Sequence, residues 1–179
     1  IQRTGVAAPP SDTHFIQIHL GADSQSGTLY VDDIEFTEEP PSFLARRTSS
    51  VQSFSTVGDS AIFNTEIHDN GDNYSTSNGQ FTVPESGLYT FAATLLLEGN
   101  SGVRSAYARI EGSTSGVLAA EFLKDQLNTS GSQVHLTLSV AAAEVSLGET
   151  VSVKLYGTSF SNNPTMLFDY SSFSGRKIS

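Results

Sequence analysis

Hydrophobic and polar residues alternate along short runs of the chain, and the clearest runs lie between residues 61 and 97. Three apolar runs cover residues 61–67, 79–83 and 88–97, and clusters of Asp, Asn, Ser and Gly separate them. Alternation with a period of two puts every second side chain on the same face of a strand. The pattern therefore predicts three strands, each with one buried face. Pro84 cannot donate a hydrogen bond to a sheet, so we expect it at a strand end.

The same alternation predicts strands on both sides of this stretch. A short strand is expected to begin at residues 43–45, and residues 49–58 are interpreted as a surface segment with another short strand. The later predicted strands are 103–110, 117–122, 134–140, 150–156 and 167–176, with Gly- and Ser-rich turns between them. No stretch gives a convincing helical pattern, so the chain is predicted to be all-β with about ten strands.

The N-terminal region has its own pattern. Residues 14–20 and 28–36 alternate and are joined by a turn, which predicts a β-hairpin. A lone hairpin is marginally stable in water, so we expect it to pair with another segment or to be disordered. The sequence TEEPP at 37–41 is predicted to be a linker, because its two prolines end a strand and extend the chain. This division predicts a fragment at 1–36 and a domain at 42–179.

Charge and composition restrict the partners. Nine Lys and Arg residues stand against 19 Asp and Glu, and the net charge is −10. A nucleic acid or an anionic membrane is therefore disfavoured, because both need a basic protein surface. The absence of cysteine removes disulfides, thiolate catalysis and Cys-ligated zinc. No apolar run reaches the roughly 18 residues that predict a membrane-spanning helix.

Candidate chemistry is sparse. None of the four His residues lies in a nucleophile elbow or a zinc-binding helix motif, so no catalytic site is predicted. His68, Asp69 and Asp72 lie close together in sequence, and Ca²⁺ is the ion that carboxylates of this kind would take. The alternative is that Asp69 and Asp72 form a turn by bonding to their own backbone.

Aromatic side chains are the remaining candidates for ligand binding, because their rings can stack on sugars or bases. Tyr74 and Phe160 fall in predicted loops and are expected to be exposed ligand-binding residues. Most of the others follow the strand alternation and are expected to fill the core or a subunit interface. This second group consists of Tyr89, Tyr107, Tyr156, Phe168, Tyr170 and Phe173.

Three separated motifs resemble the C1q globular domain. The first is PSFLARRT at 41–48, and the third is SSFSG at 171–175. The second combines NG at 70–71, Tyr74, NGQFTVP at 78–84 and GLYTF at 87–91. The resemblance implies a ten-stranded jelly-roll β-sandwich, similar to tumour necrosis factor, that assembles as a homotrimer. It also implies that Tyr89, Phe91, Phe168 and Phe173 pack the core or the trimer interface.

A second resemblance concerns the N-terminal fragment. Residues 15–21 and 26–36 are similar to the last two strands of a jelly-roll carbohydrate-binding module. In such modules an Asp near this end often ligates a structural Ca²⁺, and Asp32 or Asp33 would take that role. The alternative is an Asp that faces solvent at the end of a strand.

Together the two resemblances imply a function. They describe a non-catalytic, trimeric recognition module of a larger secreted or cell-surface protein related to carbohydrates, with a polysaccharide or glycan as the ligand. The alternative is a structural trimerisation or fibre-tip domain that has no ligand of its own.

Overall fold

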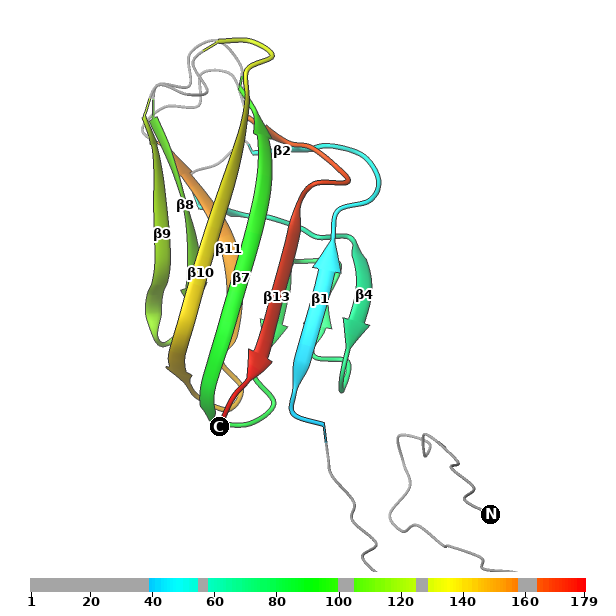
Figure 1. Ribbon diagram of the computed structural model, residues 1–179, viewed down its shortest axis with the longest axis vertical. Helices are drawn as coiled ribbons and strands as arrows, with labels where there is room; N and C mark the ends of the chain where they lie inside the picture. Colours follow the sequence, from blue (N-terminus) through cyan, green and yellow to red (C-terminus); the bar gives the residue numbers. More distant parts are fainter. Residues whose placement is uncertain (1–38, 55–57, 100–104, 125–128, 158–163) are drawn as a thin grey trace, which may run out of the picture. The chain divides into compact units, whose positions relative to one another are not determined.

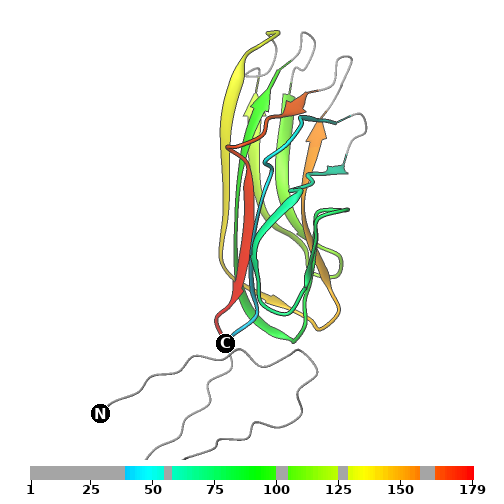
Figure 2. The same ribbon diagram turned by 90° about the vertical axis from the view of Figure 1, so that its right-hand side faces the viewer.

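The computed structural model describes residues 39–54, 58–99, 105–124, 129–157 and 164–179. These residues form thirteen strands in two antiparallel sheets. Figures 1 and 2 show the two sheets packed face to face as a sandwich. The predicted all-β class is confirmed. The count exceeds ten because β2, β3, β5 and β12 are pairings of only two residues each.

Sheet 1 is centred on the long strand β7, which pairs with β10, β12 and β13 along different parts of its length. Its strand order is β2-β12-β7-β13-β1-β4, and β10 is joined through β7. The strands are β1 (Ser42–Arg46), β2 (Gln52–Ser53), β4 (Thr65–Asp69), β7 (Gly87–Glu98), β10 (Gln133–Val145), β12 (Thr165–Met166) and β13 (Ser172–Lys177).

Sheet 2 has the order β5-β6-β11-β8-β9, and β3 pairs with β11. In the part of the chain that the structure describes, β9 is an edge strand of this sheet. The strands are β3 (Asp59–Ser60), β5 (Tyr74–Ser75), β6 (Gln80–Thr82), β8 (Ser105–Gly112), β9 (Gly116–Lys124) and β11 (Thr150–Gly157).

The core lies between the two sheets and is built from every second residue of each strand. In β7 the inward side chains are buried to 2% exposure or less, and they are Tyr89, Phe91, Ala93, Leu95 and Leu97. With no Trp in the chain, Phe and Tyr supply the large volumes. The Phe43 ring stacks on the Phe81 ring at 4.5 Å between centroids and meets the Phe173 ring edge-on at 4.9 Å. Each fully buried side chain of this size contributes about 1.5–3 kcal/mol to folding.

Two predicted strands are shorter in the structure. The strand predicted at 61–67 begins only at Thr65, because the N–H of Ile62 donates to Gln52 and its carbonyl accepts from Arg47 instead of a neighbouring strand. The strand predicted at 167–176 begins at Ser172. Before it, the chain turns at Asp169, which has a φ of 69° and whose N–H donates to the Arg47 carbonyl.

The described residues cover only part of the linker and none of the fragment predicted at the N-terminus. Residues 39–41 have no regular secondary structure, and β1 begins at Ser42. The predicted hairpin at 14–36 lies outside the described residues, so the domain division stays a prediction. Among the described residues, none forms a helix that could cross a membrane.

Candidate functional site

The outer face of sheet 1 carries only small side chains at its centre. Ala92 of β7 lies between Ser174 of β13 and Ser139 of β10, and Thr94 lies between Ser172 and Thr137 in the next row. We call this surface the small-residue face, and its members are Thr90, Ala92, Thr94, Thr137, Ser139, Ala141, Ser172 and Ser174. All eight are at least partly exposed, and none is charged.

The margins of the small-residue face are mixed. Arg176 is paired in register with Thr90 and Arg46 with Ser172, and both arginines are exposed. Tyr170 is 64% exposed, Phe168 is 44% exposed and Leu88 is 39% exposed. The Tyr170 ring meets the His135 ring edge-on at 6.2 Å. A shallow hollow of about 480 Å³ lies over part of the face, between Ala92, Ser139 and Ser174. A surface of short, uncharged side chains with exposed aromatic and aliphatic residues nearby is suited to contact with another protein surface.

The outer face of sheet 2 has the opposite character. Tyr107 of β8 is paired in register with Phe122 of β9 on one side and Tyr156 of β11 on the other, so three aromatic residues cross three neighbouring strands. The Tyr107 and Tyr156 rings stack at 5.2 Å with an angle of 6° between their planes. The Arg109 guanidinium lies 4.7 Å from the Tyr107 ring centre and 4.8 Å from that of Tyr156.

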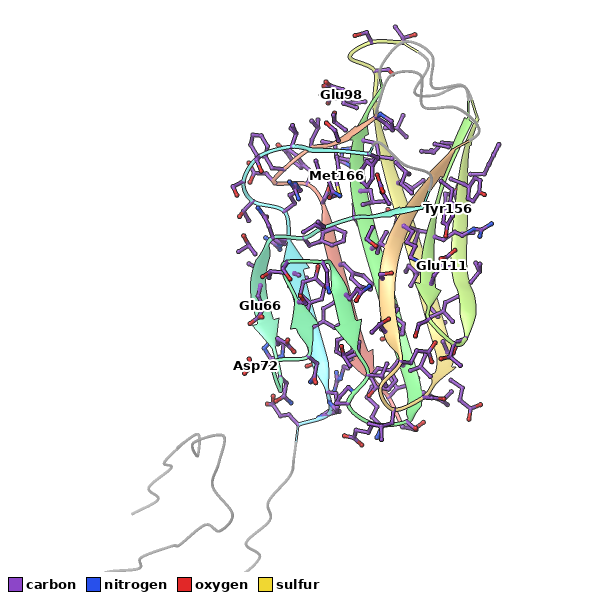
Figure 3. All side chains as sticks on the ribbon, turned by 180° about the vertical axis from the view of Figure 1, so that it is seen from behind. Glu66, Asp72, Glu98, Glu111, Tyr156 and Met166 are labelled. Carbon is purple, nitrogen blue, oxygen red and sulfur yellow. The ribbon has the colours of Figure 1, made fainter. Side chains whose placement is uncertain are left out.

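Glu111 holds this cluster together. Its carboxylate accepts a 2.8 Å hydrogen bond from the Tyr156 hydroxyl and forms ion pairs with Arg109 at 3.2 Å and Lys154 at 3.4 Å. Figure 3 labels Glu111 and Tyr156 on this sheet. Burial raises the pKa of Glu111, but the bonds from Tyr156, Arg109 and Lys154 outweigh it, and the net pKa is below its ordinary value. Burial and the neighbouring Glu111 carboxylate raise the pKa of Tyr156.

A groove lies beside this cluster. It has a volume of about 290 Å³, and it is lined by Tyr107, Arg109, Ala120, Glu121 and Phe122. We call it the Tyr107 groove. Its outer wall is the Phe122 ring, which is 57% exposed. The small side chain of Ala120 lies opposite Arg109 across the β8–β9 pair, which leaves the space open.

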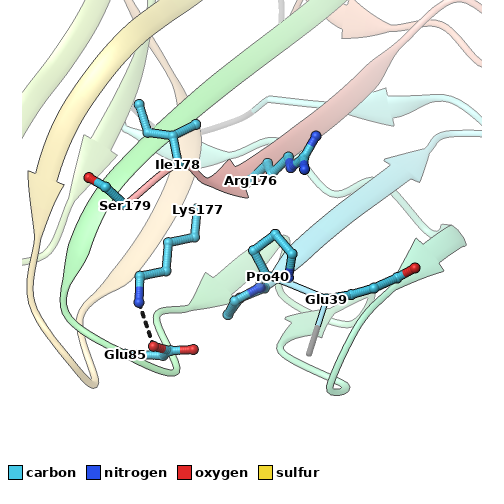
Figure 4. A pocket seen from close by; sticks show the side chains of 8 residues that line it. Glu39, Pro40, Glu85, Arg176, Lys177, Ile178 and Ser179 are labelled. Carbon is cyan, nitrogen blue, oxygen red and sulfur yellow. Dashed lines mark hydrogen bonds and ion pairs between the residues drawn. The ribbon is translucent and has the colours of Figure 1, made fainter. Parts of the chain in front are cut away.

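A further pocket of about 400 Å³ lies at the end of the sandwich where β1 begins and β13 ends (Figure 4). Glu39, Pro40 and Arg176 line it, together with an ion pair between Lys177 and Glu85. Glu85 is 52% exposed in this pair. An exposed ion pair of this kind contributes at most about 1 kcal/mol, and nothing in the pocket selects a particular ligand.

The prediction that Tyr74 is an exposed loop residue is wrong. Tyr74 lies in β5 and is 6% exposed, its ring stacks on Phe43 at 5.1 Å, and its hydroxyl donates to the Phe63 carbonyl at 3.3 Å. Burial raises its pKa. The period-two pattern was too short around Tyr74 to reveal a strand. Phe160, the other predicted ligand-binding residue, lies outside the described residues.

The four residues predicted for the core or the trimer interface divide between two environments. Tyr89, Phe91 and Phe173 are at most 2% exposed and lie in the core of the single chain. Phe168 is 44% exposed and lies outside the core. The turn at Asp169 separates Phe168 from β13 and turns it away from the alternation of that strand.

Of the predicted metal residues, Asp69 is the last residue of β4 and Asp72 lies in the turn that follows it. One oxygen of Asp69 accepts a 2.6 Å hydrogen bond from the N–H of Tyr74, while its other oxygen, Oδ1, is buried without a partner. Burial is the main cause that raises the pKa of Asp69. No group of three or more His, Cys, Asp or Glu side chains is arranged for a metal among the described residues. Ca²⁺ binding stays a prediction, and Asp32 and Asp33 lie outside the described part.

The sequence of β8 contained a signal for the Tyr107 groove. Tyr107, Arg109 and Glu111 alternate with Ala108 and Ile110, which indicates a common polar face. The position of Phe122 and Tyr156 beside them was not visible, because a period-two pattern does not say which strands are neighbours. Tyr107 and Tyr156 were grouped with residues expected mainly in the core or an interface, but both are partly exposed on the outer face.

Two antiparallel sheets connected in this order define a jelly-roll domain. The model of the C1q domain matches residues 42–175, and the chain belongs to this family. Similar solved structures include the globular domain of zebrafish complement 1qA protein, with 20% identity, a TM-score of 0.53, and coverage of 79% of this chain and 98% of that one. Murine APRIL, of the tumour necrosis factor family, has 9% identity, a TM-score of 0.54, and coverage of 77% and 98% respectively.

A search of curated proteins found no match. The predicted C1q- and tumour-necrosis-factor-like jelly roll is confirmed by the family model and by these two structures. Domains of this family are binding modules that typically form trimers, and the proteins that carry them are commonly extracellular.

Proposed function

We propose that the chain is a non-catalytic recognition module that works as a homotrimer in a larger secreted protein related to carbohydrates, with a glycan as its ligand. The observation that carries the proposal is the small-residue face of sheet 1. Six of its eight members are Ser or Thr and two are Ala. These side chains are short and none carries a charge, so a second protein surface can approach the sheet closely.

Assembly would cover exposed aromatic side chains as well as the centre of the face. Phe168 and Tyr170 are 44% and 64% exposed, so their burial against a neighbouring copy would add hydrophobic stabilisation at the edge of the face. A stable interface buries roughly 1,200–2,000 Å² in total, so in a trimer the contact would extend beyond the three strands β7, β10 and β13 that carry the small-residue face. A closed ring of three copies satisfies every such face without leaving one open.

Two carboxylates form several hydrogen bonds or ion pairs each, and this bonding supports a structural role for them instead of a catalytic one. Glu111 connects Tyr156, Arg109 and Lys154 on sheet 2. Glu149 is 3% exposed and accepts its hydrogen bonds from Ser115, Thr114 and Ser146 in two turns. Both carboxylates have a lowered pKa, which keeps them ionised. A general acid would need a pKa raised toward the working pH.

The first test is the native mass of the protein by light scattering, with and without a chelator. We expect about three times the 19.0 kDa of one chain under both conditions. A trimer that separates only in the chelator would make Ca²⁺ part of the assembly and would direct the next substitutions to Asp69 and Asp72. A monomer under both conditions would overturn the proposed assembly. A trimer that binds no glycan on any array would favour the structural trimerisation domain.

A further inference from the structure

We propose that the Tyr107 groove on the outer face of sheet 2 is a binding site for an uncharged oligosaccharide. The inference rests on the proposed function, because it names the ligand class and the site of the recognition module. The site lies on the outer face of sheet 2, so a copy seated on the small-residue face of sheet 1 does not itself cover the groove.

The groove combines the two kinds of group that sugar recognition needs. One face of a pyranose ring presents C–H groups, which pack against an aromatic ring, and its hydroxyls need donors and acceptors around the rim. Phe122 supplies an aromatic ring that is 57% exposed, and Arg109 and Glu121 line the same groove. The volume of about 290 Å³ is close to the lower end of ordinary ligand pockets, roughly 300 Å³.

The polar side of the groove is held in place before any ligand arrives. Glu111 bonds to both the Tyr156 hydroxyl and the Arg109 guanidinium, and the Tyr107 and Tyr156 rings contact the guanidinium at 4.7 and 4.8 Å. The structure gives Glu111 as the only side-chain acceptor for Arg109 among the described residues. A guanidinium has five N–H donors, and Arg109 is 31% exposed, so it retains donors for a ligand. Fixed groups lose less entropy on binding.

The charge of the surroundings selects an uncharged ligand. Arg109 and Lys154 are balanced by Glu111, to which both are paired, and by Glu121 in the groove itself. The local charge is therefore zero, and the whole chain carries −10. An anionic polysaccharide would meet repulsion without a free cation to attract it. A neutral sugar meets no such repulsion, and it exchanges hydrogen bonds to water for hydrogen bonds to these groups.

The experiment compares variants on an array of neutral oligosaccharides, which includes gluco-, xylo-, manno- and galacto-oligosaccharides, with oligogalacturonates as anionic counterparts. Hits are then measured by calorimetry. We expect Phe122→Ala to weaken binding about tenfold or more, because an exposed aromatic anchor is lost. Arg109→Lys keeps the charge but removes the planar fork, and we expect weaker binding there too. Val117→Ala is the matched control, since Val117 lies in the same strand, is 50% exposed and does not line the groove.

Light scattering gives the mass of each sample, so the trimer is tested separately from the sugar-binding site. Trimers that bind a neutral sugar, with binding lost in Phe122→Ala and kept in Val117→Ala, support the site. Trimers that bind a sugar equally well after Phe122→Ala would overturn this site and leave glycan recognition in place. Trimers that bind no neutral sugar, or prefer oligogalacturonate, would overturn the inference and leave the trimer standing. A monomer that shows the expected variant pattern would support the site and overturn the proposed assembly.

Discussion

At the scale of single residues, Glu149 is the side chain whose environment is most unusual. Its carboxylate is buried, yet it accepts hydrogen bonds from the N–H groups of Ser115 at 2.6 Å and of Thr114 and Ser146 at 3.1 Å, and from the Ser115 hydroxyl at 2.9 Å. It therefore joins the turn between β8 and β9 to the turn between β10 and β11. Gly112 lies against this carboxylate with no room for a side chain.

We expect Glu149→Gln to lower the free energy of unfolding by roughly 1–3 kcal/mol at pH 7, because an amide NH₂ would face backbone donors. Burial raises the pKa of Glu149, but the hydrogen bonds outweigh it, and the net pKa lies below the ordinary 4.5. Its stabilising contribution is therefore complete above that value and is lost as the pH falls through the folded-state pKa. Urea unfolding at pH 7 and pH 3 should show the difference between wild type and variant shrinking at the lower pH.

The control for this prediction is Glu144→Gln, which changes an exposed carboxylate at the end of β10. We expect less than about 0.5 kcal/mol from it, as for most surface substitutions. An equal loss in both variants would mean that general surface charge, and not the bonds at Glu149, sets the stability.

Tyr74 provides a second prediction at this scale. Tyr74→Ala removes a ring that stacks on Phe43 in the core, so we expect a loss of about 3–5 kcal/mol. Tyr74→Phe removes only the hydroxyl that donates to the Phe63 carbonyl at 3.3 Å, and we expect about 1 kcal/mol. Thermal unfolding of both variants measures the two losses. A Tyr74→Ala variant with wild-type stability would contradict the buried position.

At the scale of elements, the packing of β13 between β7 and β1 depends on one glycine. A Cβ atom on Gly175 would lie 2.6 Å from a ring atom of Phe43 and 2.6 Å from one of Phe91. Both rings are at most 2% exposed, so neither can move into solvent. The SxFSG motif at the end of the chain thus has a steric reason, because only glycine allows these two rings to lie directly against the strand.

We expect Gly175→Ala to destabilise the domain by about 1–3 kcal/mol or more, because the core would be overpacked. The control is Ser174→Ala on the neighbouring position, whose side chain points to the outer face and is partly exposed. Chemical unfolding of both variants should separate them clearly. If Gly175→Ala unfolds at the wild-type denaturant concentration, the close contact of β13 with the two rings is wrong.

At the scale of the whole molecule, the two outer faces of the sandwich differ in chemistry. The small-residue face of sheet 1 carries only short, uncharged side chains, while sheet 2 carries the Tyr107 groove with its aromatic rings and paired charges. This difference suits two separate roles, in which sheet 1 contacts other copies of the chain and sheet 2 binds a ligand.

The corresponding prediction is that Ala92→Arg converts a trimer of about three times 19.0 kDa to single chains. Ala92 lies at the centre of the small-residue face between Ser174 and Ser139, and a buried unpaired charge there would cost several kcal/mol. Val117→Arg, on the outer face of sheet 2, is the control and should keep the trimer mass. Light scattering and circular dichroism together check the mass and the fold. A folded Ala92→Arg trimer would exclude this face as the interface.

Local patterns in the sequence were sufficient to predict the all-β class, most of the strands and the family, because alternation and turn residues are local properties that the chain displays in order. It also placed Tyr89, Phe91 and Phe173 in a group expected in the core or at an interface. Which face of a strand meets which neighbour depends instead on how strands that are distant in sequence pack together. Tyr74 is buried because Phe43 and Phe173, which are distant in sequence, close around it. The Tyr107 groove exists because β8, β9 and β11 lie side by side, and such cross-strand pairing depends on topology that no local pattern records.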